Sequence, residues 1–184
     1  MEVLNRQCHC NQNRNQGRDQ GFTLIELVIT IAIIAIIAAM AVPSMQRQIQ
    51  QARIKDGANI LETAIKEART QAVIMQRSTR LVLTNTSTDK RATIYFVKRV
   101  SSDRDEKIAD YVLNKDLTIT TSPALTAISF SANKKAFQGE NADTKDGVMN
   151  GKFSVCYGGA TVNKYSVAID ANSNINSGKD GSCP

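Results

Sequence analysis

An apolar run between residues 21 and 43 dominates the pattern of hydrophobic and polar positions along the chain. Residues 27–42 carry no charged side chain, and their only polar side chain is the Thr30 hydroxyl. Together with Phe22, Leu24 and Ile25 they give about 20 residues, the length that a membrane-crossing helix needs. Because only a helix satisfies every backbone group within one segment in lipid, the run predicts a transmembrane helix.

The helical pattern continues beyond this run but becomes one-sided. Pro43 lacks a backbone donor and should bend the helix. Apolar residues then recur at steps of three and four, which indicates one buried stripe on a helix from about Phe22 to about Gln76. Glu62 and Lys66 are spaced to pair across one turn. The predicted stripe consists of Ile54, Ala58, Leu61, Ile65, Ala68, Ala72 and Met75.

From Thr79 onward the period shifts to two residues and β-branched and aromatic residues are frequent, which is typical of strands. We expect loops at Ser101–Ala109 and Asn133–Gly151, and a tail at Ala171–Pro184 that would be loose without a bridge to Cys183. The predicted fold class is α+β, with one long N-terminal helix packed on a mostly antiparallel β-sheet. The predicted strands are Arg80–Thr84, Arg91–Val100, Tyr111–Leu113, Leu117–Thr121, Ala127–Ser131, Ala136–Gln138, Lys152–Tyr157 and Tyr165–Asp170.

One acid, Glu26, lies near the start of the apolar segment. A carboxylate in hydrocarbon costs at least a few kcal/mol and usually marks a function. Gly21 stands directly before the segment and follows a polar leader rich in Asn, Gln and Arg. The stretch Gly21-Phe22-Thr23-Leu24-Ile25-Glu26 resembles the class III signal motif of type IV pilins and type II secretion pseudopilins, in which a glycine, an aromatic residue and a glutamate have this spacing.

This resemblance implies a maturation step and a location. A prepilin peptidase would cut between Gly21 and Phe22 and methylate the new amino group. The protein would cross the bacterial inner membrane once, with its C-terminal domain in the periplasm, before extraction into a filament. Glu26 would pair with that amino group on a neighbouring pilin or pseudopilin and fix the register between helices. The implied divisions are a removed leader at 1–21, a transmembrane assembly helix at 22–43, its amphipathic continuation at 44–77 and a β-rich domain at 78–184.

Later residues narrow the resemblance. The segment Glu67–Arg77, followed by a strand, is similar to the end of the helix in the GspH/FimT group of minor pseudopilins. Ile128-Ser129-Phe130, ahead of a glycine-bearing loop, also agrees. The resemblance implies a structural subunit that primes or caps a filament, either in a type IV pilus or in a type II secretion pseudopilus.

The four cysteines form two unlike pairs. Cys8 and Cys10 flank His9 in the leader, and because a removed, irregular segment makes a poor metal site we expect no metal or cofactor there. Cys156 and Cys183 lie in the exported part, where an oxidising compartment favours a disulfide. Such a bridge would fasten the tail to the strand around Cys156.

The formal net charge of +6 favours anionic partners without identifying nucleic acid. Arg91, Lys98 and Arg99 could contact DNA phosphates, although basic residues of this kind usually form a solvated face. Some FimT-type pilins implicated in DNA uptake carry a Gly-Arg-x-Arg motif after the last strand. That place here holds Ser173-Asn174-Ile175-Asn176, so a DNA-binding minor pilin is an alternative whose motif is missing.

A second alternative is a secreted soluble protein with an ordinary signal peptide cut after Ala39-Met40-Ala41, which the length of the run and Glu26 oppose. Asp170–Asn174 begins like a calcium loop, but Ile175 replaces the expected glycine, so we predict a turn. No histidine follows the leader, and no nucleophile–base pair or phosphate loop is evident. The sequence therefore does not predict an enzyme.

Overall fold

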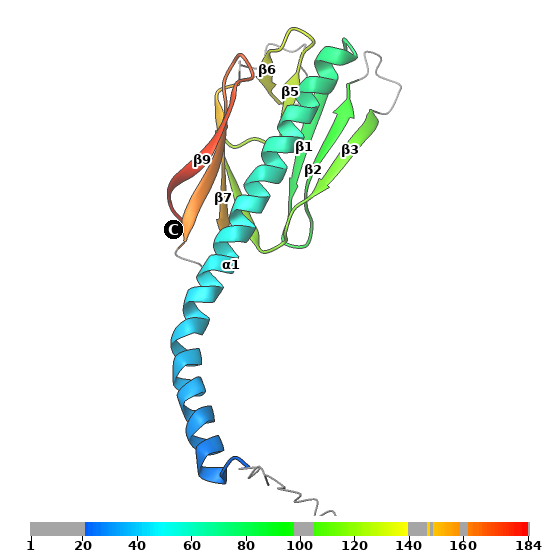
Figure 1. Ribbon diagram of the computed structural model, residues 1–184. Coiled ribbons are helices and arrows are strands. Elements are labelled where there is room, and N and C mark those ends of the chain that lie inside the picture. The colour runs from blue at the N-terminus through cyan, green and yellow to red at the C-terminus, as the bar shows by residue number, and fades with distance from the viewer. Residues whose placement is uncertain (1–20, 98–104, 140–146, 148, 159–161, 184) are drawn as a thin grey trace, which may run out of the picture. The chain divides into compact units, whose positions relative to one another are not determined.

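The computed structural model describes residues 21–97, 105–139, 147, 149–158 and 162–183. The chain divides into two compact units, residues 1–41 and residues 42–184. The first unit contributes the start of the helix, and the second contains the rest of the helix and all the strands (Figure 1). Lys98 and Arg99 lie outside the described residues, as do Cys8, His9 and Cys10.

One helix, α1 (Leu24–Ile74), contains both the apolar and the amphipathic segments, and its hydrogen-bonded assignment continues through Pro43. Every residue from Gly21 to Ile49 is exposed, which fits a segment without any partner in the monomer. Among the described residues, α1 is the one helix long and apolar enough to cross a membrane. The predicted transmembrane length is therefore present as a continuous helical segment.

The amphipathic half of α1 buries the predicted stripe, with one error at its end. Met75 is 53% exposed because the helix ends at Ile74 and Gln76 turns the chain with a φ of 50°. Gly57 and Ala64, which the stripe did not include, are buried. A Cβ added to Gly57 would lie 2.4 Å from Leu117 Cδ1, so this glycine allows a close approach between the helix and the sheet.

In the described residues, nine strands form two antiparallel sheets and not the single sheet expected. The five-stranded sheet has the order β3-β2-β1-β5-β6, and the four-stranded sheet has the order β4-β7-β8-β9. Their bounds are β1 (Thr79–Asn85), β2 (Lys90–Phe96), β3 (Glu106–Val112), β4 (Leu117–Ser122), β5 (Ala127–Phe130), β6 (Ala136–Gln138), β7 (Gly151–Tyr157), β8 (Asn163–Ile169) and β9 (Ile175–Ser182).

The structure contains strands at two places where none was predicted. Residues 106–109 of the expected loop at 101–109 belong to β3, where exposed Glu106 and Lys107 suit an edge strand and obscure the strand pattern. The tail, expected to be held by the bridge at Cys183, contains β9, which pairs with β8 at six positions from Asn163↔Ser182 to Ile169↔Ile175. Most side chains of β9 are polar and are exposed or half-buried, so its sequence lacks the apolar alternation that would predict a strand.

A single apolar core joins the helix to both sheets. Leu61 and Ile65 of α1 are fully buried together with Phe130 of the five-stranded sheet and Phe153 of the four-stranded sheet. Polar contacts complete the junction, since the Thr79 hydroxyl donates to the Ala68 carbonyl at 2.7 Å. Figure 1 shows the C-terminal half of α1 lying along the two sheets. This unit is thus a folded domain with its own core.

Candidate functional site: the N-terminal segment and the basic surfaces

The N-terminal segment has a defined local structure around the helix start. Gly21, Phe22 and Thr23 precede α1 and are not helical. The Glu26 amide donates to Thr23 Oγ1 at 3.3 Å, and the Leu27 amide donates to the Thr23 carbonyl at 3.1 Å. Thr23 is therefore the N-cap, and Glu26 is the third helical residue after it. The spacing Thr-x-x-Glu is that of a capping box. This signal for the start of a helix is present in the sequence but was not used in predicting where the helix begins.

Glu26 lies in the first turn of α1 among exposed apolar side chains. Its position at the positive end of the helix dipole favours the carboxylate by a few tenths of a kcal/mol to about 1 kcal/mol. Phe22 is 82% exposed, and Leu24, Ile25 and Leu27 are each more than half exposed. Nothing among the described residues of this unit covers these side chains.

Thr30 is the one polar side chain in residues 27–42, and it does not weaken the apolar character of the surface. Its hydroxyl donates to the Leu27 carbonyl at 2.8 Å, within the same helix. A polar group that is satisfied within its own helix needs no partner in hydrocarbon. Glu26 is therefore the only side chain in residues 24–42 with a polar group left to be satisfied by another molecule.

The two cysteines of the folded unit form a disulfide, Cys156–Cys183, with their Cα atoms 5.7 Å apart. Cys156 belongs to β7, and Cys183 directly follows β9, so the bridge links two strands that are not neighbours in the order of the sheet. The Cys183 amide also donates to the Val162 carbonyl at 2.9 Å. The bridge therefore holds the end of β9 against its neighbours.

Of the three predicted DNA contacts, only Arg91 lies in the described residues, and acidic side chains engage it. Arg91 Nε donates to Asp89 at 2.8 Å, and Arg91 Nη1 pairs with Asp110 at 3.0 Å. These two carboxylates, Asp89 foremost, hold the pKa of Arg91 above its ordinary value. Lys107 also pairs with Asp110, at 2.8 Å. A guanidinium engaged by two carboxylates is a poor phosphate contact, because binding would have to displace them.

The Gly-Arg-x-Arg motif is expected after the last strand, and the last strand is β9 and not β8. Ser173–Asn176 was therefore the wrong position at which to look for this motif. Ser173–Asn176 connects β8 to β9 and enters β9, and only Cys183 and Pro184 follow the last strand. The sequence contains no arginine after Arg104, so the motif is absent from either position.

The predicted turn at Asp170–Asn174 is present. Asp170 Oδ1 accepts from the amides of Asn172 at 2.9 Å and Asn174 at 2.8 Å, and these bonds, with that of Asn174 foremost, lower the pKa of Asp170. The carboxylate is thus occupied by its own turn and not directed at a cation. Among the described residues, no group of three metal-binding side chains occurs.

Comparisons with known proteins agree with this arrangement. Residues 16–42 match the family described as the prokaryotic N-terminal methylation motif. The chain is 32% identical over 136 residues to a fimbrial protein of Pseudomonas aeruginosa, covering 73% of this chain and 86% of the relative. It is also 47% identical over 53 residues to a fimbrial protein of Moraxella nonliquefaciens, covering 27% of this chain and 34% of that relative.

The fold has a solved counterpart. The crystal structure of the type IV minor pilin FimU of Pseudomonas aeruginosa aligns with a TM-score of 0.53 and 18% identity, over 71% of this chain and 99% of that one. A long N-terminal helix on antiparallel sheets, preceded by a methylation motif, defines a type IV pilin-like protein. The chain belongs to this family of fimbrial proteins, whose members are structural subunits and not enzymes.

Proposed function

We propose that this protein is a minor pilin of the GspH/FimT type that is matured by a prepilin peptidase and incorporated into a type IV pilus. The cut would fall between Gly21 and Phe22, and the new amino group of Phe22 would be methylated. The uncut bond lies before the helix, where the backbone is open to a peptidase. The folded unit would stand in the periplasm, with Leu24–Val42 in the inner membrane.

The observation that carries this proposal is the helix surface from Leu24 to Ile49. It is exposed throughout, strongly apolar up to Val42, and interrupted only by Glu26 in the membrane-length part. An apolar helix of this length without cover is stable in lipid or among other helices, and not in water. A filament whose core is built from such helices provides the second environment.

Glu26 gives the packing its register. In a bundle of apolar helices, sliding one helix past another changes little, because every position offers similar contacts. A carboxylate that pairs with the methylated amino group of a neighbouring Phe22 has one favourable position, since either charge alone is costly in hydrocarbon. The contact is head-to-tail and does not close on itself, so it propagates as a helical filament.

The pilus is favoured over a secretion pseudopilus because the two curated relatives are both described as fimbrial proteins. A minor subunit at the tip or in the priming complex is favoured by the resemblance to the GspH/FimT group and by the fold shared with a minor pilin. The alternatives are not supported by a specific observation. Arg91 is engaged by acids, and α1 continues through the cut site that an ordinary signal peptide would need.

Mass analysis of the N-terminus of the protein from native membranes tests the proposal. The expected mass corresponds to a chain that begins with N-methylated Phe22, and immunoblots should find the protein in sheared pili. A chain that begins near Val42, or one that retains Met1, contradicts the maturation step. Absence from sheared pili, together with presence in a purified secretion complex, contradicts the pilus assignment.

The role of Glu26 is tested by Glu26→Gln with Thr30→Val as the control inside the same segment. The amide keeps the shape but removes the charge, so cleavage should continue while the amount in sheared pili falls at least about tenfold, since one lost ion pair in hydrocarbon is worth more than about 1.4 kcal/mol. The control should leave both cleavage and incorporation unchanged. Equal incorporation of the Gln variant would refute the role.

A further inference from the structure

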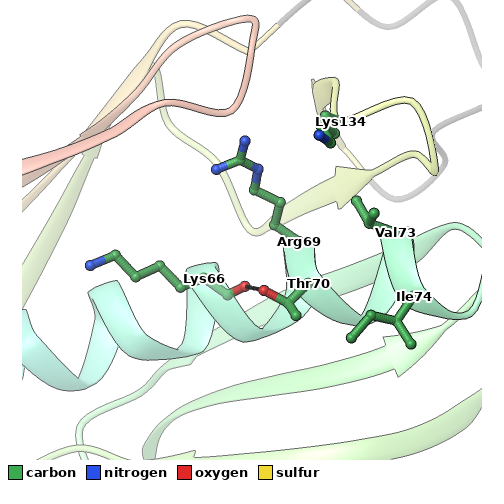
Figure 2. A pocket seen from close by; sticks show the side chains of 6 residues that line it. All are labelled: Lys66, Arg69, Thr70, Val73, Ile74 and Lys134. Carbon is green, nitrogen blue, oxygen red and sulfur yellow. Dashed lines mark hydrogen bonds between the residues drawn. The ribbon is translucent and has the colours of Figure 1, made fainter.

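The folded unit has one groove that combines exposed apolar side chains with cations. Figure 2 shows the side chains that line it, Lys66, Arg69, Thr70, Val73, Ile74 and Lys134. Its volume is about 410 Å³. A second hollow next to it shares Lys66 and Arg69 and continues to the turn at Asp170–Asn176. Together they form a continuous surface beside the C-terminal turns of α1, which we call the helix-end groove.

The apolar part of the groove is unusual for this unit. Beyond residue 50, the described large hydrophobic residues that stay exposed are Ile74, Met75 and Val112. Ile74 lines the groove and is 66% exposed, and Met75 is its neighbour in the chain. Two of these three residues, Ile74 and Met75, therefore lie together at the end of α1, which gives this place a surface suited to an apolar contact.

The polar part of the groove is cationic. Arg53, Arg77, Arg80 and Arg91 each form an ion pair with a carboxylate, whereas neither Arg69 nor Lys134 forms one with any described residue. Lys66 pairs with Glu62, whose second oxygen accepts from Ser177. No acidic side chain lines the apolar part of the groove. The apolar part of the groove therefore presents at least two cations, from α1 and from the turn before β6, and no acid. Asp170 lines the adjoining hollow and interacts electrostatically with Arg69, but its carboxylate oxygens already accept hydrogen bonds within its own turn.

The turn that carries Lys134 is held in place. Lys134 has a φ of 61°, a conformation that side chains other than glycine rarely adopt, and its carbonyl accepts from the buried Ser173 hydroxyl at 2.8 Å. Backbone strain of this kind costs about 1–3 kcal/mol and persists only where the surroundings enforce it. The backbone at Lys134 is consequently held at the edge of the groove.

We propose that the helix-end groove docks an acidic segment of a different pilus subunit, with an apolar side chain on Val73 and Ile74 and a carboxylate between Arg69 and Lys134. Arg69 and Val73 are four residues apart on α1, about 6 Å along its axis, so the carboxylate and the apolar group would be two residues apart in an extended segment. This inference rests on the proposed function, because the partner is a subunit of the same filament.

A second copy of this chain is a poor occupant. The chain is basic, with a net charge of +6, so two copies repel each other at long range. Its described carboxylates after residue 50 are almost all engaged in ion pairs or hydrogen bonds, and Asp56 is the exception among them. A different subunit with a free carboxylate supplies a group that the described residues after residue 50 of a copy offer only at Asp56.

Photo-crosslinking in cells that assemble pili tests the docking. The full chain carries p-benzoylphenylalanine in place of Ile74, and mass spectrometry identifies the attached peptide. The expected product is a peptide of another pilin with an Asp or Glu within about three residues of the crosslink. A crosslink to nucleic acid, to lipid or to a segment without an acid overturns the proposal, as does no crosslink from protein that is present in sheared pili.

Charge reversal supplies the second arm. Arg69→Glu with Lys134→Glu should lower the crosslink yield more than tenfold, and changing the partner's acid to Lys should restore it. Lys55→Glu with Lys135→Glu makes the same change in net charge on exposed residues outside the groove and should leave the yield unchanged. Equal losses in the two double variants, or no restoration, overturn the proposal. A different result would refute the proposed function, and with it the identity of the partner. That result is a mature chain that does not begin with methylated Phe22, or the absence of the wild-type protein from sheared pili.

Discussion

The disulfide between Cys156 and Cys183 should contribute a large part of the stability of the four-stranded sheet. The proposed perturbation is the double substitution Cys156→Ser with Cys183→Ser, which keeps the side-chain size and leaves no free thiol in the folded unit. The bridge closes a loop over a sequence separation of 27 residues. In the chain-entropy relation, a loop of this length stabilises the folded state by about 3.5 kcal/mol at 25 °C.

The loss should be concentrated in β9. Only Ile175 at its start and Cys183 just after its end contribute apolar side chains to the core, so β9 depends on backbone pairing with β8 and on the bridge. The core residues Val167 and Ile169 of β8 remain packed when β9 detaches, because they contact the helix side of the sheet. We therefore expect local opening of β9 to precede unfolding of the whole unit.

Thermal unfolding of the full chain in detergent, followed by circular dichroism, measures the first effect. A loss of about 3.5 kcal/mol corresponds to a fall in Tm of roughly 7–14 °C for a unit of this size. Hydrogen exchange measures the second, since the amides of β8 and β9 should lose protection before those of β1 and β2. Ser154→Ala with Ser182→Ala is the matched control beside the bridge. A Tm change below about 1 °C, or a uniform loss of protection, would refute the reasoning.

Two further predictions concern packing and acid stability. Gly57→Val should lower the free energy of unfolding by about 1–3 kcal/mol, because its Cβ would lie 2.4 Å from the buried Leu117 Cδ1. Urea titration measures this loss, and Asn59→Val, at an exposed position of the same helix, is the control. Equal stability of the two variants would contradict the close approach. Lys107, Thr93 and Arg91 lower the pKa of Asp110, so its stabilising effect is present above its ordinary value, near 3.8, and is lost as pH falls through the lower folded value. The Tm of Asp110→Asn should therefore fall less than that of the wild type between about pH 4 and pH 2. An equal fall in Tm for the two proteins over this pH range would contradict the stabilising role of Asp110.

Elements whose cause is local were predictable from the sequence. The change from an apolar run to a one-sided stripe located α1, and β6 lies at the predicted residues. Met75 was misplaced because a periodic pattern does not reveal where the sheets stop covering the helix. The predicted stripe also omitted Gly57, because a glycine has no apolar side chain and so does not add to a hydrophobic pattern, even where it permits a close contact.

Elements whose cause is non-local were missed. β9 is held by backbone pairing with β8 and by a bridge to β7, and neither leaves an apolar alternation in residues 175–182. The helix-end groove brings Arg69 and Lys134 together from elements that are distant in sequence. Arg91 was assigned as a possible DNA contact because the sequence does not show that Asp110 of the next strand faces it. Charge pairing across strands requires the register, which only the fold supplies.

The apolar segment of α1 also limits what can drive assembly. Lipid tails and neighbouring apolar helices are similar environments for leucine and isoleucine, so moving this segment from the bilayer into a filament gains little hydrophobic free energy. The difference between the two environments must come from a group that lipid accommodates poorly, and Glu26 is the one such side chain in residues 24–42. Unpaired in the bilayer, its carboxylate is costly; paired with the amino group of a neighbouring Phe22, it is stable. On the proposed function, one acid therefore supplies both the free-energy bias toward the filament and the register within it. Moving the acid one turn along the helix, with Glu26→Thr and Thr30→Glu, should preserve the composition and the overall hydrophobicity and yet reduce the amount of the protein in sheared pili as much as Glu26→Gln does.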